Sequence, residues 1–135
     1  MNTLPFDSTK SVVVKDELIS LLEKLVSFDT VNDLPKGKML TRDCPEFIVQ
    51  YLKEKGIESD IFEDEGFYSV YGKIGSGDFH LLLMAHFDVV PIGDGWNTDP
   101  FKMAIKEGIV YGRGVIDNKN NIASIMSILP AIQNS

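Results

Sequence analysis

A nearly unbroken apolar run, from Phe79 to Ala85, limits the possible folds more than any other feature of this sequence. Its letters are FHLLLMA, and the stretch from Leu81 onward has no polar side chain until the run ends. Such a run, without the alternation of a half-exposed strand, is typical of a strand buried on both faces of a sheet. We therefore expect a central, buried strand that ends at Ala85.

Helical and strand patterns lie on both sides of this run. Apolar residues recur near the 3.6-residue repeat in some segments, and they alternate or cluster between turn residues in others. Helices are expected at residues 11–27, 43–55 and 118–129. Strands are expected at residues 57–63, 67–74, 79–85, 101–105 and 109–111. This order favours an α/β fold with a mixed sheet layered with helices.

Composition and charge narrow the class of protein. Hydrophobic residues make up 44% of the 135 residues, which is enough for a packed core. The net charge of −7 argues against nucleic-acid or anionic-membrane partners. No signal peptide is expected, because the N-terminal residues lack a basic region followed by an apolar stretch.

Cys44 is the only cysteine, so an intramolecular disulfide is impossible and a cytoplasmic location is expected. We expect Cys44 to be a half-exposed structural residue.

The first candidate site follows the apolar run directly. His86 and Asp88 stand two residues apart, so in an extended backbone they project to the same side. Ligands in open α/β sheets collect beyond the carboxyl ends of strands, where this pair lies. One side chain can bind a metal while the other orients it. The alternative is a structural histidine at a strand end, satisfied by a turn aspartate.

The second candidate site is the sequence Tyr111-Gly-Arg-Gly-Val-Ile-Asp117. Two glycines flank an arginine, and Asp117 then precedes the last expected helix. A carboxylate held at a helix start can bridge cations. The alternative is an ordinary N-cap, for which aspartate is a preferred residue.

Together the two segments resemble a known signature. The string runs His86-x-Asp88-Val-Val-Pro, then Trp96, then Asp-Pro-Phe at 99–101, then the segment that ends in Asp117-x-Lys119. The two aspartates are 117 − 88 = 29 positions apart. This pattern resembles the zinc-dependent amidohydrolases and metallopeptidases that include acetylornithine deacetylase, succinyl-diaminopimelate desuccinylase, aminoacylase, carboxypeptidases and dipeptidases. The match is specific over residues 81–128 and general over residues 11–74.

The resemblance implies a role for each matching residue. His86 is expected to be a zinc ligand, Asp88 a catalytic carboxylate that supports His86 and the metal-bound water, and Asp117 a bridge between two zinc ions, with cobalt as a possible substitute. Imidazole nitrogen and carboxylate oxygen are ordinary zinc ligands. The sequence departs from the signature at Ala85 and Asn120, where the family commonly has glycine. The second departure affects the helix start and removes no ligand.

The same resemblance implies that further ligands, a general-base glutamate and a smaller lid or dimerisation domain belong to the complete enzyme. We therefore expect residues 1–135 to be a truncated N-terminal part of a zinc-peptidase-like catalytic domain, inactive alone. The expected activity of the parent enzyme is metal-dependent hydrolysis of the amide bond of an N-acyl amino acid, in amino-acid biosynthesis. Dipeptidase or carboxypeptidase activity is the alternative, and an inert domain is a second one. The expected partners are a small-molecule substrate and a second copy in a homodimer.

Overall fold

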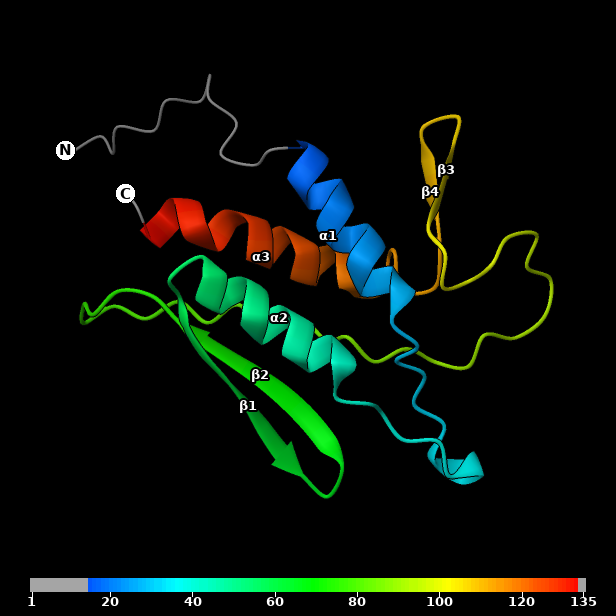
Figure 1. The fold of residues 1–135 in the computed structure, drawn as a ribbon, viewed down its shortest axis with the longest axis horizontal. Helices are drawn as coiled ribbons and strands as arrows, with labels where there is room; N and C mark the ends of the chain where they lie inside the picture. The colour runs from blue at the N-terminus through cyan, green and yellow to red at the C-terminus, as the bar shows by residue number, and fades with distance from the viewer. Residues whose placement is uncertain (1–14, 134–135) are drawn as a thin grey trace.

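The computed structural model describes residues 15–133, which form helices and two antiparallel hairpins (Figure 1). The helices are α1 (Lys15–Ser27), the short 3-10 helix η1 (Leu34–Lys36), α2 (Asp43–Glu54) and α3 (Lys119–Gln133). The strands are β1 (Glu58–Asp64), β2 (Phe67–Lys73), β3 (Ala104–Lys106) and β4 (Ile109–Tyr111). This mixture of helices and small sheets confirms the α/β class. Within the described residues, no helix is long and apolar enough to span a membrane.

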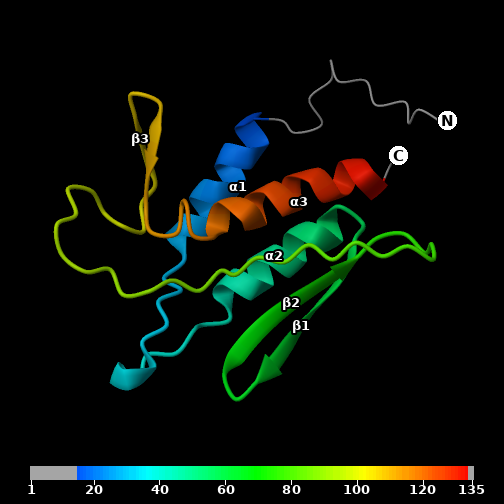
Figure 2. The same cartoon turned by 180° about the vertical axis from the view of Figure 1, so that it is seen from behind.

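The core lies between the helices. α1 packs on α3, and α2 lies between α3 and the β1–β2 hairpin (Figures 1 and 2). Leu25 and Val26 of α1 and Ala123 and Met126 of α3 are almost fully buried where these two helices meet. The three helices predicted from periodicity are confirmed, although the predicted residues 11–14 lie outside the described residues. α3 continues past the predicted end, through Pro130.

Cys44 belongs to this core as well. It lies in the first turn of α2 and has no exposed surface. The expectation of a half-exposed cysteine was therefore wrong. The apolar face of α2 turns Cys44 inward together with Ile48 and Leu52. Burial raises the pKa of the Cys44 thiol to about 12, because the thiolate would lose its hydration.

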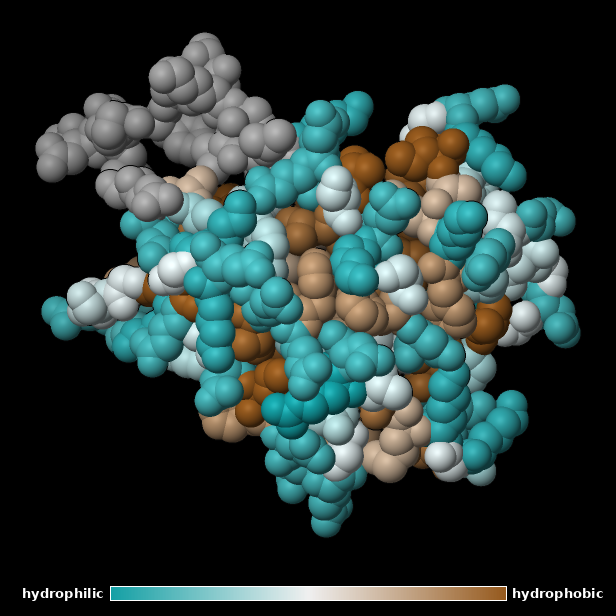
Figure 3. All heavy atoms as spheres, viewed as in Figure 1, coloured by the Kyte–Doolittle hydropathy of each residue, from teal (hydrophilic) through white to brown (hydrophobic). Residues whose placement is uncertain are grey.

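Each hairpin forms locally. β1 and β2 pair antiparallel around a turn at Glu65 and Gly66, both of which have positive φ angles. Two positive φ angles in a row match the right-handed twist of a hairpin. β3 and β4 pair around Glu107 and Gly108 in the same way. Figure 3 shows hydrophobic side chains exposed on this second hairpin, which include Ile105 and Ile109.

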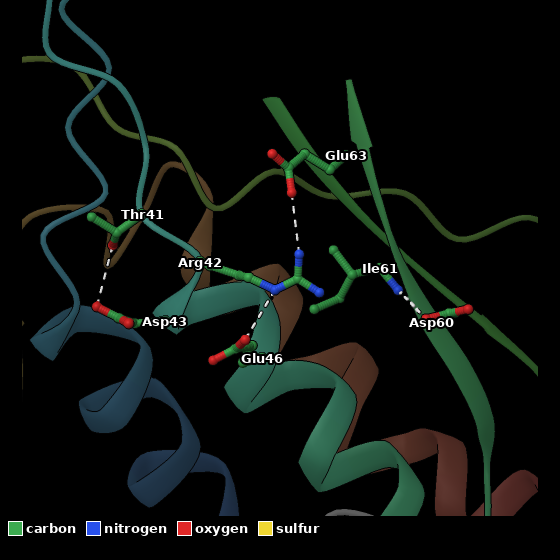
Figure 4. A network of polar contacts seen from close by, with 7 residues as sticks. All are labelled: Thr41, Arg42, Asp43, Glu46, Asp60, Ile61 and Glu63. Atoms are coloured by element: carbon green, nitrogen blue, oxygen red, sulfur yellow. Dashed lines mark hydrogen bonds and ion pairs between the residues drawn. The ribbon is translucent and has the colours of Figure 1, made fainter. Parts of the chain in front are cut away.

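An exposed ion-pair network joins α2 to β1 (Figure 4). The guanidinium of Arg42 reaches Glu46 at 2.9 Å and Glu63 at 3.1 Å. All three side chains remain about half exposed, so the network contributes at most about 1 kcal/mol per pair. The packing of α2 on the hairpin therefore depends mainly on apolar contacts, which include the buried Leu52 and Ile57.

The prediction of a buried strand that ends at Ala85 was wrong. Residues 79–85 form no strand, and Phe79, Leu82 and Met84 are 86%, 75% and 80% exposed. In Figures 1 and 2 this segment is an extended stretch that passes behind α2 in the first view and in front of it in the second, without a sheet partner. A buried strand needs hydrogen-bonded neighbours as well as apolar side chains. In the described chain the sheets are two separate antiparallel pairs, and neither includes this run.

Candidate active site

The structure brings the three predicted site residues together. The Nε2 atom of His86 lies 3.0 Å from Oδ1 of Asp117, although the residues are 31 positions apart. Its Nδ1 atom lies 3.0 Å from the carbonyl oxygen of Asp88 and 3.1 Å from Oδ1 of the same residue. The imidazole of His86 therefore stands between two carboxylates, one at each ring nitrogen. A purely structural role for His86 and Asp117 would be favoured if the two side chains pointed apart, but they point toward each other.

A short extended segment after α1 positions His86 and Asp88. The Val89 N–H donates to the Thr30 carbonyl at 2.9 Å, and the Asn32 N–H donates to the Val89 carbonyl at 3.0 Å. Val31 and Val89 form a parallel bridge there. Because side chains alternate along an extended chain, Phe87 and Val89 are buried while His86 and Asp88 face outward. The predicted i, i+2 geometry of the pair is thus present without the buried strand.

A glycine-containing loop positions Asp117. Gly114 has a φ of +87°, and a Cβ added there would lie 3.0 Å from Val89 and from Lys119. The loop therefore packs directly against the His86 segment. Asp117 is not the N-cap of α3, since α3 begins at Lys119, whose N–H donates to the Gly114 carbonyl. The Asp117–Asn118 peptide bond is cis, and the Asp117 side chain is 82% exposed.

The two segments line one open cavity of about 370 Å³. Its polar lining consists of Asn32, His86, Asp88, Arg113 and Asp117, and Val90 and Ile116 are among the residues that add apolar surface. Partial burial favours the neutral ring of His86, but the hydrogen bonds with Asp88 and Asp117 and their negative charges outweigh it and raise the pKa of His86. A cation in this cavity would meet the same two carboxylates that attract the imidazolium proton.

Arg113 and Trp96, both part of the recognised signature, hold the loop that follows Asp88. Nη2 of Arg113 donates to the Pro91 and Ile92 carbonyls at 3.1 and 2.5 Å. The indole of Trp96 donates to the same Ile92 carbonyl, and the guanidinium lies 5.2 Å from the ring centroid. A cation–π contact of this kind strengthens both partners. Arg113 thus lines the cavity, and Trp96 supports it from outside.

Two buried polar residues lie near the site, and the sequence analysis assigned a role to neither: Lys119 was named only as the last position of the signature, and Thr30 was not singled out. The hydroxyl of Thr30 donates to the Phe87 carbonyl at 2.6 Å, and Lys119 has no exposed surface. A signal for Lys119 was present in the sequence. It falls at the head of the apolar stripe of α3, at i, i+3, i+4 and i+7 with three buried residues, Ile122, Ala123 and Met126. No comparable pattern points to Thr30.

The donor set fits a zinc ion in chemistry and spacing. Two ligands on one tetrahedral zinc, each about 2.0–2.2 Å from the metal, lie roughly 3.3 Å apart. The 3.0 Å between His86 Nε2 and Asp117 Oδ1 is close to this separation. Among residues 15–133, no group of three or more His, Cys, Asp or Glu side chains is arranged to hold an ion. The described part of the chain therefore offers two converging donors, with Asp88 against the far nitrogen of His86.

The known proteins that are similar to this chain match the part of it that contains the site residues. Residues 82–135 match the model of peptidase family M20/M25/M40. Succinyl-diaminopimelate desuccinylase from Nautilia profundicola is 44% identical over 111 residues, which cover 81% of this chain and 28% of that protein. The enzyme of the same name from Wolinella succinogenes is 36% identical over 121 residues, 88% of this chain and 31% of that protein.

A relative with a different name is similarly close. The Beta-Ala-Xaa dipeptidase of Lactobacillus delbrueckii subsp. lactis is 38% identical over 115 residues. That match covers 78% of this chain and 23% of the dipeptidase. The chain thus spans between about a quarter and a third of the length of these three relatives.

Proposed function

We propose that the whole protein hydrolyses the amide bond of an N-acyl amino acid with zinc bound at His86 and Asp117. The premise of this proposal is that the chain belongs to peptidase family M20/M25/M40. One observation carries the proposal. The imidazole of His86 and the carboxylate of Asp117 converge in one open cavity with their donor atoms 3.0 Å apart.

Each residue has a role suited to its place. Nε2 of His86 and the exposed carboxylate of Asp117 would hold zinc, and Asp117 has two oxygens with which to bridge a pair of ions. When bound, such ions polarise a carbonyl and lower the pKa of water. Nδ1 of His86 would donate to the main-chain carbonyl of Asp88 at 3.0 Å, with the Asp88 carboxylate at 3.1 Å, and these contacts fix the tautomer and the orientation of the ring. The protonated form of His86 must lose its proton before Nε2 can bind a metal.

The substrate class is inferred from named relatives. Two of them are called succinyl-diaminopimelate desuccinylases, a name that denotes removal of an acyl group from an amino acid. These names favour an N-acyl amino acid substrate. A place in amino-acid biosynthesis, a cytoplasmic location and a homodimeric parent enzyme belong to the same proposal, and they rest on the resemblance of the sequence signature alone. The relative named as a Beta-Ala-Xaa dipeptidase supports dipeptide hydrolysis as the second candidate. Residues 1–135 by themselves are proposed to be inactive, because the described part offers only two converging metal donors.

A substrate panel tests the function. The whole protein would be stripped with a chelator, reloaded with Zn²⁺ or Co²⁺, and assayed on N-succinyl and N-acetyl amino acids beside β-alanyl dipeptides. We expect metal-dependent release of the free amino acid, with kcat/KM highest on the N-acyl substrates. Preference for the dipeptides would favour the second candidate. Full activity after chelation, or no hydrolysis of either class, would refute the proposal. His80→Ala serves as a control, because His80 is exposed and lies outside the cavity.

A further inference from the structure

We propose that Lys119 and Thr30 are positioning residues that together fix the distance between His86 and Asp117. Each links one half of the site to the same short stretch of chain at the end of α1. The proposal concerns the geometry of the site and holds whichever reaction the site performs.

Lys119 anchors the Asp117 half. It stands two residues after Asp117 and is fully buried. Its Nζ atom donates to the Leu25 carbonyl at 2.8 Å and to the Phe28 carbonyl at 2.9 Å, at the C-terminal end of α1. Its own N–H donates to the Gly114 carbonyl, which closes the loop that carries Asp117. Both the side chain and the main chain of Lys119 therefore restrain this loop.

Thr30 anchors the His86 half. It stands two residues after Phe28, whose carbonyl Lys119 holds, and it is fully buried. Its hydroxyl donates to the Phe87 carbonyl at 2.6 Å, and its carbonyl accepts from the Val89 N–H. These two hydrogen bonds hold the main chain in place immediately after His86.

The two anchors complete a short path between the site residues. From Asp117 the path runs through Lys119 to Phe28, along two residues to Thr30, and across to the residue after His86. Every step is either a covalent link of one or two residues or a hydrogen bond shorter than 3 Å. The two halves are also packed together at Gly114, because Val89 and the stem of Lys119 both lie against this glycine.

The chemistry of Lys119 supports this role over simple core filling. An apolar residue of similar length would fill the same space without the cost of burying an ammonium group. Within the described residues, the hydrogen bonds of the ammonium go to two main-chain carbonyls at a helix end. Cations favour this position, because the carbonyls there lack helical partners. The charge is thus placed where it ties α1 to the loop of Asp117.

The imidazole signals of His86 and His80 in the metal-free whole protein test the proposal, each identified by its disappearance in His86→Gln or His80→Gln. Long-range ¹H–¹⁵N spectra at one near-neutral pH would be recorded for the wild type, Lys119→Met and Thr30→Val. In the wild type, the His86 signals should differ from those of exposed His80 because of its two carboxylate contacts. In both variants we expect them to shift most of the way toward the His80 signals.

Ser59→Ala is the matched control. Ser59 is also a buried residue whose hydroxyl donates to a main-chain carbonyl, that of Val49 in α2. It should leave the His86 signals in place. Unmoved His86 signals in folded Lys119→Met and Thr30→Val would overturn the proposal, as would an equal shift in Ser59→Ala. If Lys119→Met fails to fold, the milder Thr30→Val decides the outcome on the same criterion.

Discussion

Gly114 should be far less tolerant of a side chain than a glycine of the same backbone conformation elsewhere. Gly114 has a φ of +87° and Gly108 a φ of +80°, so alanine at either position costs about 1–2 kcal/mol of left-handed strain. A Cβ at Gly114 would also lie 3.0 Å from Val89 and from Lys119, whereas one at Gly108 would meet no atom within 4 Å. Val89 and Lys119, which lie against Gly114, are both buried and cannot easily move aside.

The difference between the two substitutions isolates the packing cost. Overpacking a filled interior costs about 1–3 kcal/mol. We therefore expect Gly114→Ala to lower the free energy of unfolding by about 2–5 kcal/mol and Gly108→Ala by about 1–2 kcal/mol, the sums of these contributions. The excess for Gly114→Ala should be about 1–3 kcal/mol.

Urea denaturation followed by circular dichroism measures this excess. With a slope near 2 kcal/mol per molar urea, the midpoint of Gly114→Ala should fall below that of Gly108→Ala by about 0.5–1.5 M. Equal midpoints would refute the reasoning, because they would mean that the His86 segment and the Asp117 loop are not in close contact at Gly114. A change in slope would need correction before the two values are compared.

Three further predictions concern single side chains. In the whole protein, Asp88→Asn should lower turnover by about 10–100-fold while zinc content is kept, and unchanged turnover would remove Asp88 from the mechanism. The raised pKa of His86 stabilises the metal-free fold below the ordinary value of 6.5, and this contribution should disappear as pH rises through the raised value. Chemical denaturation across this pH range should show that the free energy of unfolding falls less in His86→Gln than in the wild type. An equal fall in the two proteins would contradict this prediction. Cys44 should react with a thiol reagent only on unfolding, because it is buried and its pKa is raised to about 12, so rapid labelling of the folded chain would argue against this packing.

The local elements could be predicted from the sequence because their signals are local. The 3.6-residue repeat marks α1, α2 and α3, and alternation with Glu-Gly turns marks the two hairpins. The run at residues 79–85 could not be placed in the same way. Its apolar side chains suggest burial, but strand formation depends on partners distant in sequence, and the described chain supplies none along this run.

The candidate site shows the same division. His86 and Asp117 were predicted together from a spaced signature, and the structure brings them within 3.0 Å of each other. Their supports, Thr30 and Lys119, act through main-chain carbonyls. Any residue provides such a carbonyl, so the sequence carries no mark of the acceptor. Lys119 ends the signature, but a lysine suggests an exposed position, and its register with the apolar stripe of α3 is the sequence feature that indicates burial.

Zinc content of the whole protein tests the central claim most directly. The wild type, His86→Ala, Asp117→Ala and the control His80→Ala would be purified identically and their bound metal measured by mass spectrometry. The account predicts that His86→Ala and Asp117→Ala lose most of their zinc, whereas His80→Ala, altered outside the cavity, retains the wild-type amount. Zinc contents that are equal in all four proteins would contradict the assignment of His86 and Asp117 as metal ligands.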